Sequence, residues 1–367
     1  MAKILIGMSG GVDSSVAAAL LVRAGHDVTG VTLKLWDGEE GPEAPWQERS
    51  CCKVGLARHV SDTLSIPHRV VDVRERFRRH VVDDFLDAYS AGDTPNPCVR
   101  CNESVKFTGL LKLAEDEGYD AVATGHYARI ERTGAGGWRL LTGADANKDQ
   151  SYFLYRIPKA DLPRIRLPLG AMTKPLVYEI ARSLGLPAEE IAESQEICFV
   201  GSGDYRDFLL SERPEAKRPG DVVDLDGNTL GHHDGVALHT IGQRRGLGVA
   251  VGERVYVVDT DPVTNRVVLG PDEALLADGL EADQINLLAP FSEGRVDARI
   301  RYRSKPVPAT ATVADGRLSI RFDTPQRAVA PGQSVVLYRD GTVIGGGIIR
   351  HATRATPTSE HGLELSA

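Results

Sequence analysis

The sequence has little cysteine and no long apolar run, and each shortage excludes a class of protein. No apolar stretch approaches the roughly 20 residues needed to cross a bilayer, which excludes a membrane-spanning helix. Five cysteines in 367 residues are too few, and odd in number, for the disulfide framework of a secreted domain. A strand signal begins at Lys3 and leaves no room for a signal peptide. We therefore expect a cytoplasmic protein whose thiols are free, catalytic or metal-bound.

Positive charge is also in deficit. The net charge of −8 argues against a protein coated with cations for nucleic acid. Residues 284–350 nevertheless carry ten Lys and Arg against five Asp and Glu, a net of +5, which leaves −13 for the rest of the chain. This asymmetry fits either a local nucleic-acid patch or an ordinary solvated strand face.

Residues 1–212 alternate strand and helix signals. We expect strands at 3–8, 27–33, 68–72 and 121–124, and helices at 15–24, 49–64, 74–89, 106–117 and 173–184. This alternation predicts an α/β domain with a doubly wound parallel sheet, which binds ligands at the C-terminal ends of its strands. The acidic stretch 37–48, rich in Gly and Pro, indicates a mobile surface loop.

After residue 213 the pattern changes to short β-branched runs separated by turn residues. These runs lie at 221–225, 254–259, 266–269, 298–302, 309–313, 318–322, 334–338 and 342–349. They predict two small antiparallel β domains, 213–279 and 280–352, with a seam near 270–283. The polar tail 353–367 is expected to be disordered.

A strand signal, a glycine-rich turn and a helix signal follow one another at the N-terminus. This arrangement aims backbone N–H groups and a positive helix end at a phosphate. It is not a Walker loop, because no Gly-Lys-Ser/Thr follows the glycines. The segment resembles the pyrophosphatase loop Ser-Gly-Gly-x-Asp-Ser of enzymes that split ATP into AMP and pyrophosphate. Its expected nucleotide contacts are Gly7, Met8, Ser9, Gly10, Gly11, Val12, Asp13 and Ser14. The carboxylate in this loop also suits Mg²⁺.

Two segments carry the remaining chemistry of interest. Cys98 and Cys101 follow two prolines in the stretch 94–102, and we expect these prolines to stiffen a loop and to exclude helix. Half of a structural zinc site is one alternative, although no second Cys-x-x-Cys exists, and a thioredoxin-like redox pair is another. Cys198 fits either a small core residue or a reactive thiol. Cys51 and Cys52 are read as packing or first-turn residues.

Two polar motifs are weaker signals. At the predicted end of the strand 121–124, Gly125 allows close backbone approach to a nucleotide, and His126 fits a base, a polar contact or an ordinary capping histidine. The cluster 147–152 fits a polar binding segment or a simple helix start.

Taken in order, these motifs resemble the tRNA 2-thiouridylase family (tRNA-uridine 2-sulfurtransferases), and the resemblance covers almost the whole chain. It extends to Gly-Gln-Arg-Arg-Gly-Leu-Gly at 242–248, to 301–302 and to Pro-Gly-Gln at 331–333. The phosphate loop alone is shared by several ATP pyrophosphatases, whereas Cys101 and Cys198 together with 242–248 are far more specific. The resemblance implies an ATP-pyrophosphatase domain of the adenine nucleotide alpha hydrolase type.

The resemblance also implies a reaction and its residues. Mg-ATP would adenylate O2 of the wobble uridine in the anticodon loop, and sulfur would replace that oxygen, releasing AMP and pyrophosphate. Cys198 would receive persulfide sulfur from a donor protein, and Cys101 would act on it by releasing hydrosulfide or closing a disulfide. Leu33 and Gly125 would join the phosphate loop in holding ATP. The tRNA contacts would be Asn96, Pro97, Cys98, His126, Lys148, Asp149, Gln150, Arg301, Tyr302 and Gln333.

The chain departs from the family pattern in two places. Position 98 is Cys where some members carry Asp, and position 33 is Leu where others have Met. Three thiols, at 98, 101 and 198, would leave one iron of a four-iron cluster open to bind hydrosulfide, so an iron–sulfur cluster is a secondary hypothesis.

Two other functions compete with tRNA thiolation. An ATP-pyrophosphatase ligase or amidotransferase would need an ammonia source, and neither an N-terminal cysteine nor a glutaminase segment is evident. A non-catalytic, ATP-gated RNA-binding protein would leave the cysteines merely structural.

Overall fold

The computed structural model describes residues 1–36, 53–134, 136–186, 188, 191, 197–201, 203–249 and 252–354. The predicted loop 37–48, Cys51, Cys52 and almost all of the predicted tail lie outside these ranges. Within them, no helix is long and apolar enough to cross a membrane.

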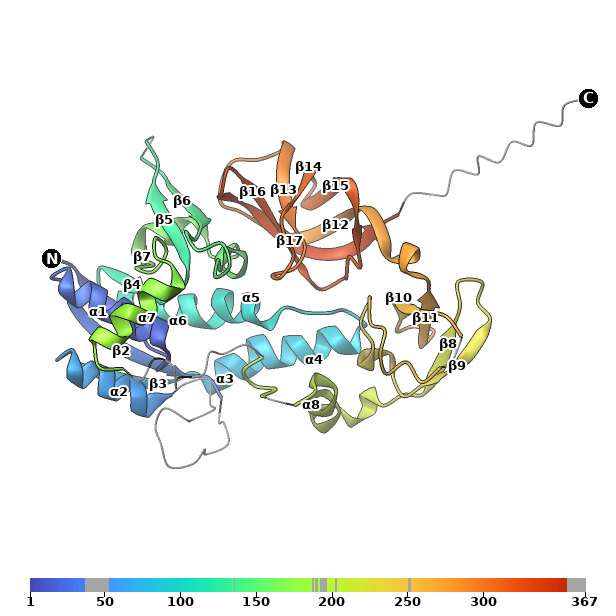
Figure 1. Cartoon of the computed structure of the whole chain (residues 1–367), viewed down its shortest axis with the longest axis horizontal. Coiled ribbons are helices and arrows are strands. Elements are labelled where there is room, and N and C mark those ends of the chain that lie inside the picture. The colour runs from blue at the N-terminus through green and yellow to red at the C-terminus, as the bar shows by residue number, and fades with distance from the viewer. Residues whose placement is uncertain are drawn as a thin grey trace, which may run out of the picture.

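A parallel sheet next to the N-terminus organises the first domain (Figure 1). Its strand order is β3-β2-β1-β4-β7, and every neighbouring pair is parallel. Because the chain moves outward from β1 and later returns to its other side, the order reverses between β1 and β4, where such sheets bind ligands. The strands are β1 Lys3–Gly7, β2 Asp27–Lys34, β3 His68–Asp72, β4 Ala121–Ala123 and β7 Ile165–Arg166. Only β7 was not predicted.

Helices cover both faces of this sheet, because consecutive side chains of β1 are buried on opposite faces. Ile4 and Ile6 enter one core, and Leu5 enters the other. The helices α1, α2 and α7 cover the first face, and the run from α4 to α6 covers the second. The helices are α1 Val12–Arg23, α2 Val54–Thr63, α3 Arg74–Phe77, α4 Asp83–Ser90, α5 Pro97–Cys101, α6 Thr108–Asp116, α7 Lys174–Ser183 and α8 Tyr205–Glu212.

Two π-helical turns interrupt the second helical layer without breaking it. The turn η1, Arg78–Val82, joins α3 to α4, and η2, Asn102–Phe107, joins α5 to α6. A π turn adds a residue to the helical repeat and is frequent at functional sites. The helix predicted at 106–117 is therefore the second half of a longer helical run.

The expectation that two prolines exclude helix from 94–102 is wrong. Helix α5 begins at Pro97, where a missing N–H costs nothing because the first turn has no intrahelical acceptor. The side chain of Asn96 caps this helix by accepting a hydrogen bond from the backbone N–H of Val99 at 3.2 Å. Cys98 and Cys101 consequently lie about one turn apart on a helix.

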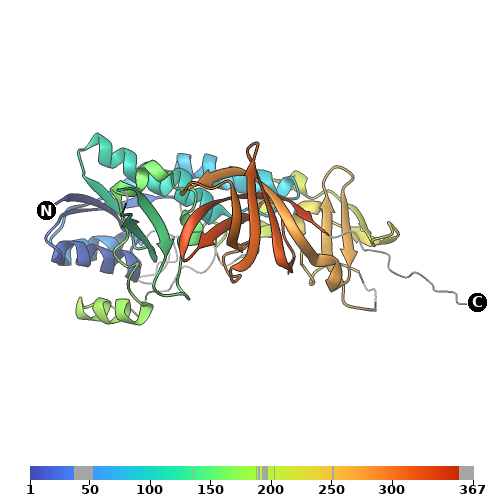
Figure 2. The same ribbon diagram turned by 90° about the horizontal axis from the view of Figure 1, so that it is seen from above.

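The C-terminal strands close into a barrel that lies above α4 and α5 in Figure 1 and is seen from above in Figure 2. The closed order is β12-β15-β14-β13-β16-β17, with β12 also pairing β17, and all pairs are antiparallel. Its strands are β12 Leu276–Leu287, β13 Glu293–Arg299, β14 Val307–Ala314, β15 Arg317–Arg327, β16 Ser334–Arg339 and β17 Thr342–Thr353.

A hairpin from the first domain extends this barrel sheet, and sequence patterning missed it. Strands β5, Ala128–Arg132, and β6, Trp138–Thr142, pair with each other, and β6 pairs with β17 through Leu141 and Thr342. The hairpin follows directly on β4, so the barrel is attached to the edge of the sheet where ligands are expected.

The middle domain is a four-stranded sheet of order β10-β11-β8-β9. Its strands are β8 Gly220–Val223, β9 Thr229–His233, β10 Tyr256–Asp261 and β11 Arg266–Gly270. The domain is β-rich as predicted, but the pair β8–β11 is parallel while the other two pairs are antiparallel.

The seam expected at 270–283 stays a prediction, and the structure shows which elements lie in it. A short 3-10 turn, Asp272–Leu275, leads directly into β12. Gly279 lies in β12 where a Cβ would approach the carbonyl oxygen of Ile320 to 2.3 Å, so this glycine allows close strand packing. We place the start of the third domain at Leu276 as a proposal.

Candidate active site

The predicted phosphate loop lies between β1 and α1 and turns on Gly10. Gly10 has φ +75°, and a Cβ there would lie 2.2 Å from the carbonyl oxygen of Lys53. The backbone N–H of Lys53 donates to the carbonyl of Ser9 at 2.9 Å. The hydroxyl of Ser14 donates to the carbonyl of Gly11 at 3.0 Å and accepts from the N–H of Ser9 at 3.3 Å. These bonds fix the loop at the N-terminus of α1, where backbone N–H groups and the helix dipole favour an anion.

Asp13, in the first turn of α1, is ion-paired with a residue that the sequence did not single out. The Nζ atom of Lys174 lies 2.8 and 2.9 Å from its two carboxylate oxygens, and the hydroxyl of Tyr127 donates to it at 2.7 Å. Lys174 is the first residue of α7 and is 7% exposed. From the sequence alone, it is only part of a predicted helix. Because both oxygens of Asp13 are engaged, this carboxylate does not fit a preformed Mg²⁺ site.

The end of β4 packs directly against the start of α1. A Cβ at Gly125 would lie 2.8 Å from backbone atoms of Asp13 and Ser14, so the residue is small for contact with the helix. The Nδ1 atom of His126 and the hydroxyl of Thr124 form a hydrogen bond at 2.8 Å. Burial lowers the pKa of His126 to about 3, so its ring is neutral at physiological pH. His126 therefore does not offer a cation to a phosphate.

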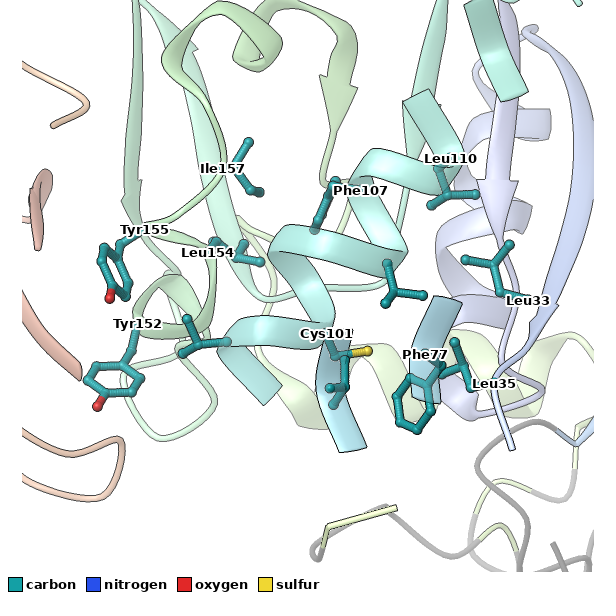
Figure 3. Packing of buried hydrophobic residues seen from close by; sticks show 14 of the residues in the cluster. Leu33, Leu35, Phe77, Cys101, Phe107, Leu110, Tyr152, Leu154, Tyr155 and Ile157 are labelled. Atoms are coloured by element: carbon teal, nitrogen blue, oxygen red, sulfur yellow. The ribbon is translucent and has the colours of Figure 1, made fainter. Parts of the chain in front are cut away.

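The two thiols of α5 have different surroundings. Cys101 is 6% exposed and belongs to the apolar core that includes Leu33 and Phe77 (Figure 3). Cys98 is exposed to solvent at its surface, yet the protein around it desolvates the thiol and raises its pKa. The carbonyl of Cys98 also accepts a hydrogen bond from the side chain of Asn102 at 3.1 Å. Of the two, only Cys98 is open to a reactant in this conformation.

Cys198 is exposed on a short turn that its neighbour fixes in place. The ring of Phe199 is 5% exposed and packs edge-on against Phe77 and Phe85, with centroids 5.8 and 5.2 Å away. Rings of Trp36 and Phe208 complete the cage at 6.2 and 5.3 Å. Burying this ring holds the adjacent thiol at the surface beside the second helical layer.

Lys106, on the π turn η2, connects the thiol helix to the end of β4. Its ammonium lowers the pKa of both the Cys98 thiol and the His126 imidazole, so it lies within electrostatic range of both. A thiolate at Cys198 likewise acts on the pKa of Cys98, raising it. Sequence patterning did not single out Lys106, because a lysine on a helical run has no local signature of its partners.

The three cysteines do not fit an iron–sulfur cluster in this arrangement. Within the described residues no group of three His, Cys, Asp or Glu side chains is placed to hold a metal ion. Cys101 lies in the apolar core while Cys98 and Cys198 are exposed, so the three sulfurs do not converge on one open position.

The barrel clamps the segment that leads into α5. The side chain of Gln333 donates to the carbonyls of Thr94 and Pro95 at 2.9 and 3.3 Å. The N–H of Thr94 donates to the carbonyl of Pro331 at 2.8 Å, and a Cβ at Gly332 would lie 2.8 Å from the nitrogen of Thr94. The predicted tRNA contact Gln333 therefore lies beside the segment that leads into Asn96 and Pro97.

The cluster 148–150 lies where the first domain meets the barrel. Asp149 and Gln150 of this cluster have different partners. The carboxylate of Asp149 is 5% exposed and accepts from the N–H of Gly143 at 3.0 Å, from Ser151 and, at 3.1 Å, from Arg299 of the barrel. Gln150 binds the backbone of Tyr127, accepting its N–H at 3.0 Å and donating to its carbonyl at 2.8 Å. Asp149 thus acts inward, and its predicted RNA contact would require these bonds to break.

Arg301 and Tyr302 follow β13 at the edge of the barrel. Burial, with the nearby cation of Arg327, lowers the pKa of Arg301, and its Nε atom is buried without a hydrogen-bond partner in the described structure. The ring of Tyr302 lies 4.3 Å from that of Phe153, and the guanidinium of Arg299 lies 5.3 Å from it. A buried donor atom without a hydrogen-bond partner is costly unless a ligand uses it.

Half of the positive charge of segment 284–350 is neutralised by acids. Five of its arginines form ion pairs, and most of the acidic partners lie outside the segment: Arg295–Asp323, Arg299–Asp149, Arg317–Glu281, Arg327–Asp272, and Arg350 with Asp93 and Asp283. These five arginines fit the second interpretation of the charge asymmetry, an ordinary solvated protein surface. A nucleic-acid patch in this segment would therefore depend on its other cations.

Family models match the chain in three successive parts. They are described as the tRNA methyl transferase HUP domain over residues 2–202, the tRNA methyl transferase PRC-barrel domain over 206–271, and the aminomethyltransferase β-barrel domain over 277–349. A HUP domain with a phosphate loop at its strand ends, followed by two β domains, defines an ATP-binding enzyme class, and confirms the predicted fold class.

Relatives match over nearly the whole chain. The tRNA-specific 2-thiouridylase MnmA of Geobacter metallireducens is 48% identical, covering 95% of this chain and 96% of its own. Those of Roseiflexus castenholzii and Geotalea uraniireducens are 46% and 45% identical, covering 95% and 98% of this chain and 99% and 98% of their own. The chain therefore belongs to the tRNA-specific 2-thiouridylase family, whose members are tRNA-uridine 2-sulfurtransferases.

Proposed function

We propose that this chain catalyses ATP-dependent 2-thiolation of the wobble uridine of tRNA. ATP adenylates O2 of the base, and persulfide sulfur then replaces the activated oxygen, releasing AMP and pyrophosphate. The observation that carries this proposal is one juxtaposition. Phe107, at the end of the π turn that continues the thiol helix, lies with its ring 5.7 Å from that of His126, which follows the strand packed against the phosphate loop. This contact supports adjoining places for nucleotide chemistry and sulfur chemistry.

The nucleotide would occupy the switch point between β1 and β4. Its contacts are assigned to residues 7–14, Leu33 and Gly125, and the buried ammonium of Lys174 is close enough to this loop to balance phosphate charge. A uridine carbonyl oxygen is a poor leaving group, and adenylation converts it into a good one. Magnesium would arrive with the nucleotide, since Asp13 already holds a lysine.

Sulfur would enter at Cys198, whose exposure suits transfer from a donor protein. The terminal sulfur of its persulfide attacks C2 of the adenylated base and AMP leaves. Cys101, by resemblance, then attacks Sγ of Cys198 and frees the thiocarbonyl while a disulfide closes. Because Cys101 is 6% exposed, this step requires the helix or its apolar neighbours to move when tRNA binds.

The anticodon loop would lie between α5 and the barrel, with the target base flipped out beside Asn96, Pro97 and Cys98. Further contacts are assigned to His126, Lys148, Gln150, Arg301, Tyr302 and Gln333, with Asp149 orienting its neighbours. Such a reaction belongs in the cytoplasm, where tRNA, ATP and reduced thiols coexist.

The test is incubation with unmodified tRNA, Mg-ATP and sulfide, followed by mass spectrometry of the nucleosides. We expect one sulfur to replace one oxygen in the wobble uridine, with AMP and pyrophosphate formed in equal amounts. A Gly10→Val variant, which cannot form the loop, should still bind tRNA and lose thiolation. An unchanged wobble uridine with the wild-type protein would overturn the proposal.

A further inference from the structure

Strand β12 of the barrel has a bulge at Gln284, where the barrel meets the thiol helix α5. Asp283 pairs with Ile348 of β17 and Asn286 pairs with Gly346, so three steps along β12 match two along β17. Such an extra residue redirects a side chain, and bulges are frequent beside functional sites. Gln284 is exposed and has φ +47°, a backbone conformation that residues other than glycine adopt only at a cost. The strain marks this position as one to explain.

The bulge is fixed in place by bonds from the residues on both sides of it. The side-chain amide of Asn286 donates to the carbonyls of Tyr155 and Ile157 at 2.6 and 3.0 Å. On the other side, the carboxylate of Asp283 accepts a hydrogen bond from Nε of Arg350 at 2.8 Å. The direction in which the bulge points is therefore set by its neighbours.

The side chain of Gln284 reaches Arg100, the residue that precedes Cys101 on α5. The Nη2 atom of Arg100 donates to Oε1 of Gln284 at 2.8 Å. The same guanidinium pairs with Glu103 at 3.4 Å and with Asp84 of α4 at 3.3 Å. Arg100 therefore attaches the C-terminal end of α5 both to its own helical layer and to the barrel.

A second arginine joins the same network. The Nη1 atom of Arg156 donates to the backbone carbonyl of Gln284 at 2.6 Å, and its Nε donates to Glu103 at 2.6 Å. Gln284 thus accepts from two guanidinium groups, and hydrogen bonds from charged donors are the stronger kind. The two arginines balance the carboxylates of Glu103 and Asp84 in charge, so the network suits an attachment between domains better than a site for a further ion.

We propose that Gln284 is a positioning residue, which fixes the C-terminal end of α5 relative to the barrel. Gln333 holds the segment before the helix through the carbonyls of Thr94 and Pro95, so the barrel attaches the thiol helix at two points. Two points fix the orientation of a short helix, whereas one would let it swing. This inference rests on the proposed function, because it takes α5 to carry sulfur chemistry and the barrel to hold RNA.

The thiol of Cys101 reports on this attachment. Cys101 is 6% exposed among the core side chains of Figure 3, and it directly follows Arg100. Freeing Arg100 from the barrel should let the end of α5 open locally more often, which exposes this thiol without unfolding the domain. The same freedom should slow sulfur transfer, because misplacement by about 1 Å can cost a hundredfold in rate.

The variant Gln284→Gly removes the side chain and keeps the bulge, because glycine adopts φ +47° freely. The full chain, without tRNA or ATP, is treated with iodoacetamide, and modification of Cys101 is followed on its tryptic peptide, 101–106. We expect alkylation about tenfold faster than in the wild type, because a hydrogen bond from a charged donor is lost, with no fall in the urea midpoint.

Two matched variants show whether the lost contact is the cause. Gln284→Glu keeps an acceptor for Arg100 and should be alkylated at the wild-type rate. Gln326→Ala, in which a barrel glutamine that donates to the carbonyls of Thr324 and Pro325 is lost, should also leave the rate unchanged. An unchanged rate in Gln284→Gly, or an equal acceleration in Gln326→Ala, would overturn the proposal.

A double variant tests whether Gln284 acts through Arg100. Arg100→Gln should itself speed alkylation of Cys101, read from the fragment ions of peptide 80–106, since trypsin no longer cleaves at position 100. Adding Gln284→Gly should then change nothing further, because the shared contact is already absent. Independent, multiplying effects would refute the assignment.

The link to the reaction has its own readout. Protein loaded with inorganic polysulfide is mixed with tRNA and Mg-ATP, and we expect Gln284→Gly to thiolate in a single turnover about tenfold more slowly while its Kd for ATP stays the same. Single-turnover thiolation at the wild-type rate would refute the positioning role. Absence of thiolation in the wild type would instead contradict the proposed function, and the alkylation assays, which contain no tRNA, would still test the attachment.

Discussion

Replacing Phe199 with alanine tests whether an aromatic cage positions Cys198, the thiol proposed to carry sulfur. The ring is 5% exposed and has four aromatic neighbours with centroids between 5.2 and 6.2 Å away. Cys198 is the preceding residue, and it is exposed. Removing the ring should therefore release the thiol without altering the thiol itself, the phosphate loop or helix α5.

The size of the effect follows from burial. A buried Phe→Ala change costs about 3–5 kcal/mol. A domain of this kind has a free energy of unfolding of about 5–15 kcal/mol, so the loss is large. If the turn that carries Cys198 stays packed against the domain, the free energy of unfolding of the whole domain falls by this full amount. If the turn detaches, the domain loses less and Cys198 becomes mobile, and misplacement of about 1 Å can cost a hundredfold in rate.

The assays are urea unfolding and, with tRNA bound, the rate of bridge formation between Cys101 and persulfide-loaded Cys198. Phe322→Ala in the barrel is the matched control, since that ring is 6% exposed and belongs to a different core. We expect both variants to lose stability or local order, but only Phe199→Ala to slow the bridge about a hundredfold. Phe199→Leu should recover part of the rate.

Bridge formation at the wild-type rate in Phe199→Ala would refute this reasoning. So would an equal slowing in Phe322→Ala, because it would show that general destabilisation and not the cage controls Cys198.

Three other predictions concern separate parts of the molecule. Gly10→Ala should abolish ATP binding in calorimetry and cost about 1–3 kcal/mol of stability through backbone strain, and unchanged binding would contradict the loop assignment. Gln333→Ala should lower tRNA thiolation while ATP binding stays the same, since it frees the carbonyl of Thr94; loss of ATP binding would contradict this. Burial lowers the pKa of His233 and His239 from 6.5, so the folded state favours their neutral forms. Stability is complete above pH 6.5 and declines as pH falls towards the folded pKa values; a thermal midpoint constant between pH 7.5 and 5 would disprove it.

Sequence patterning predicted the parallel sheet well, because strands buried on both faces are apolar and alternate regularly with helices. It failed where proline had two meanings, because Pro97 begins a helix instead of excluding one. The hairpin β5–β6 was missed because its partner, β17, lies about two hundred residues away in sequence.

For the candidate site, the sequence indicated which segments contain motif residues, but it did not indicate the partners that individual side chains contact. The phosphate-loop motif lies between β1 and α1, and Gln333, predicted to contact tRNA, donates to the carbonyl of Thr94; the binding roles of both stay predictions. Lys174 and Lys106 were missed, since a lysine at a helix start or on a π turn has no local signature of its partners. Asp149 was assigned an outward role, but its carboxylate is buried, which depends on Arg299 in a distant strand.

The barrel contacts both ends of the candidate site. It binds the segment before α5 through Gln333, and it pairs through β17 with the hairpin that begins two residues after His126. A further bond runs from the N–H of Thr142 to the carbonyl of Gly341 at 2.9 Å. An RNA loop seated on the barrel would therefore be positioned relative to the thiol helix and to the nucleotide edge by the same element. On the proposed function, the barrel would therefore set the distance between adenylation and sulfur transfer, in addition to any affinity for RNA that it supplies.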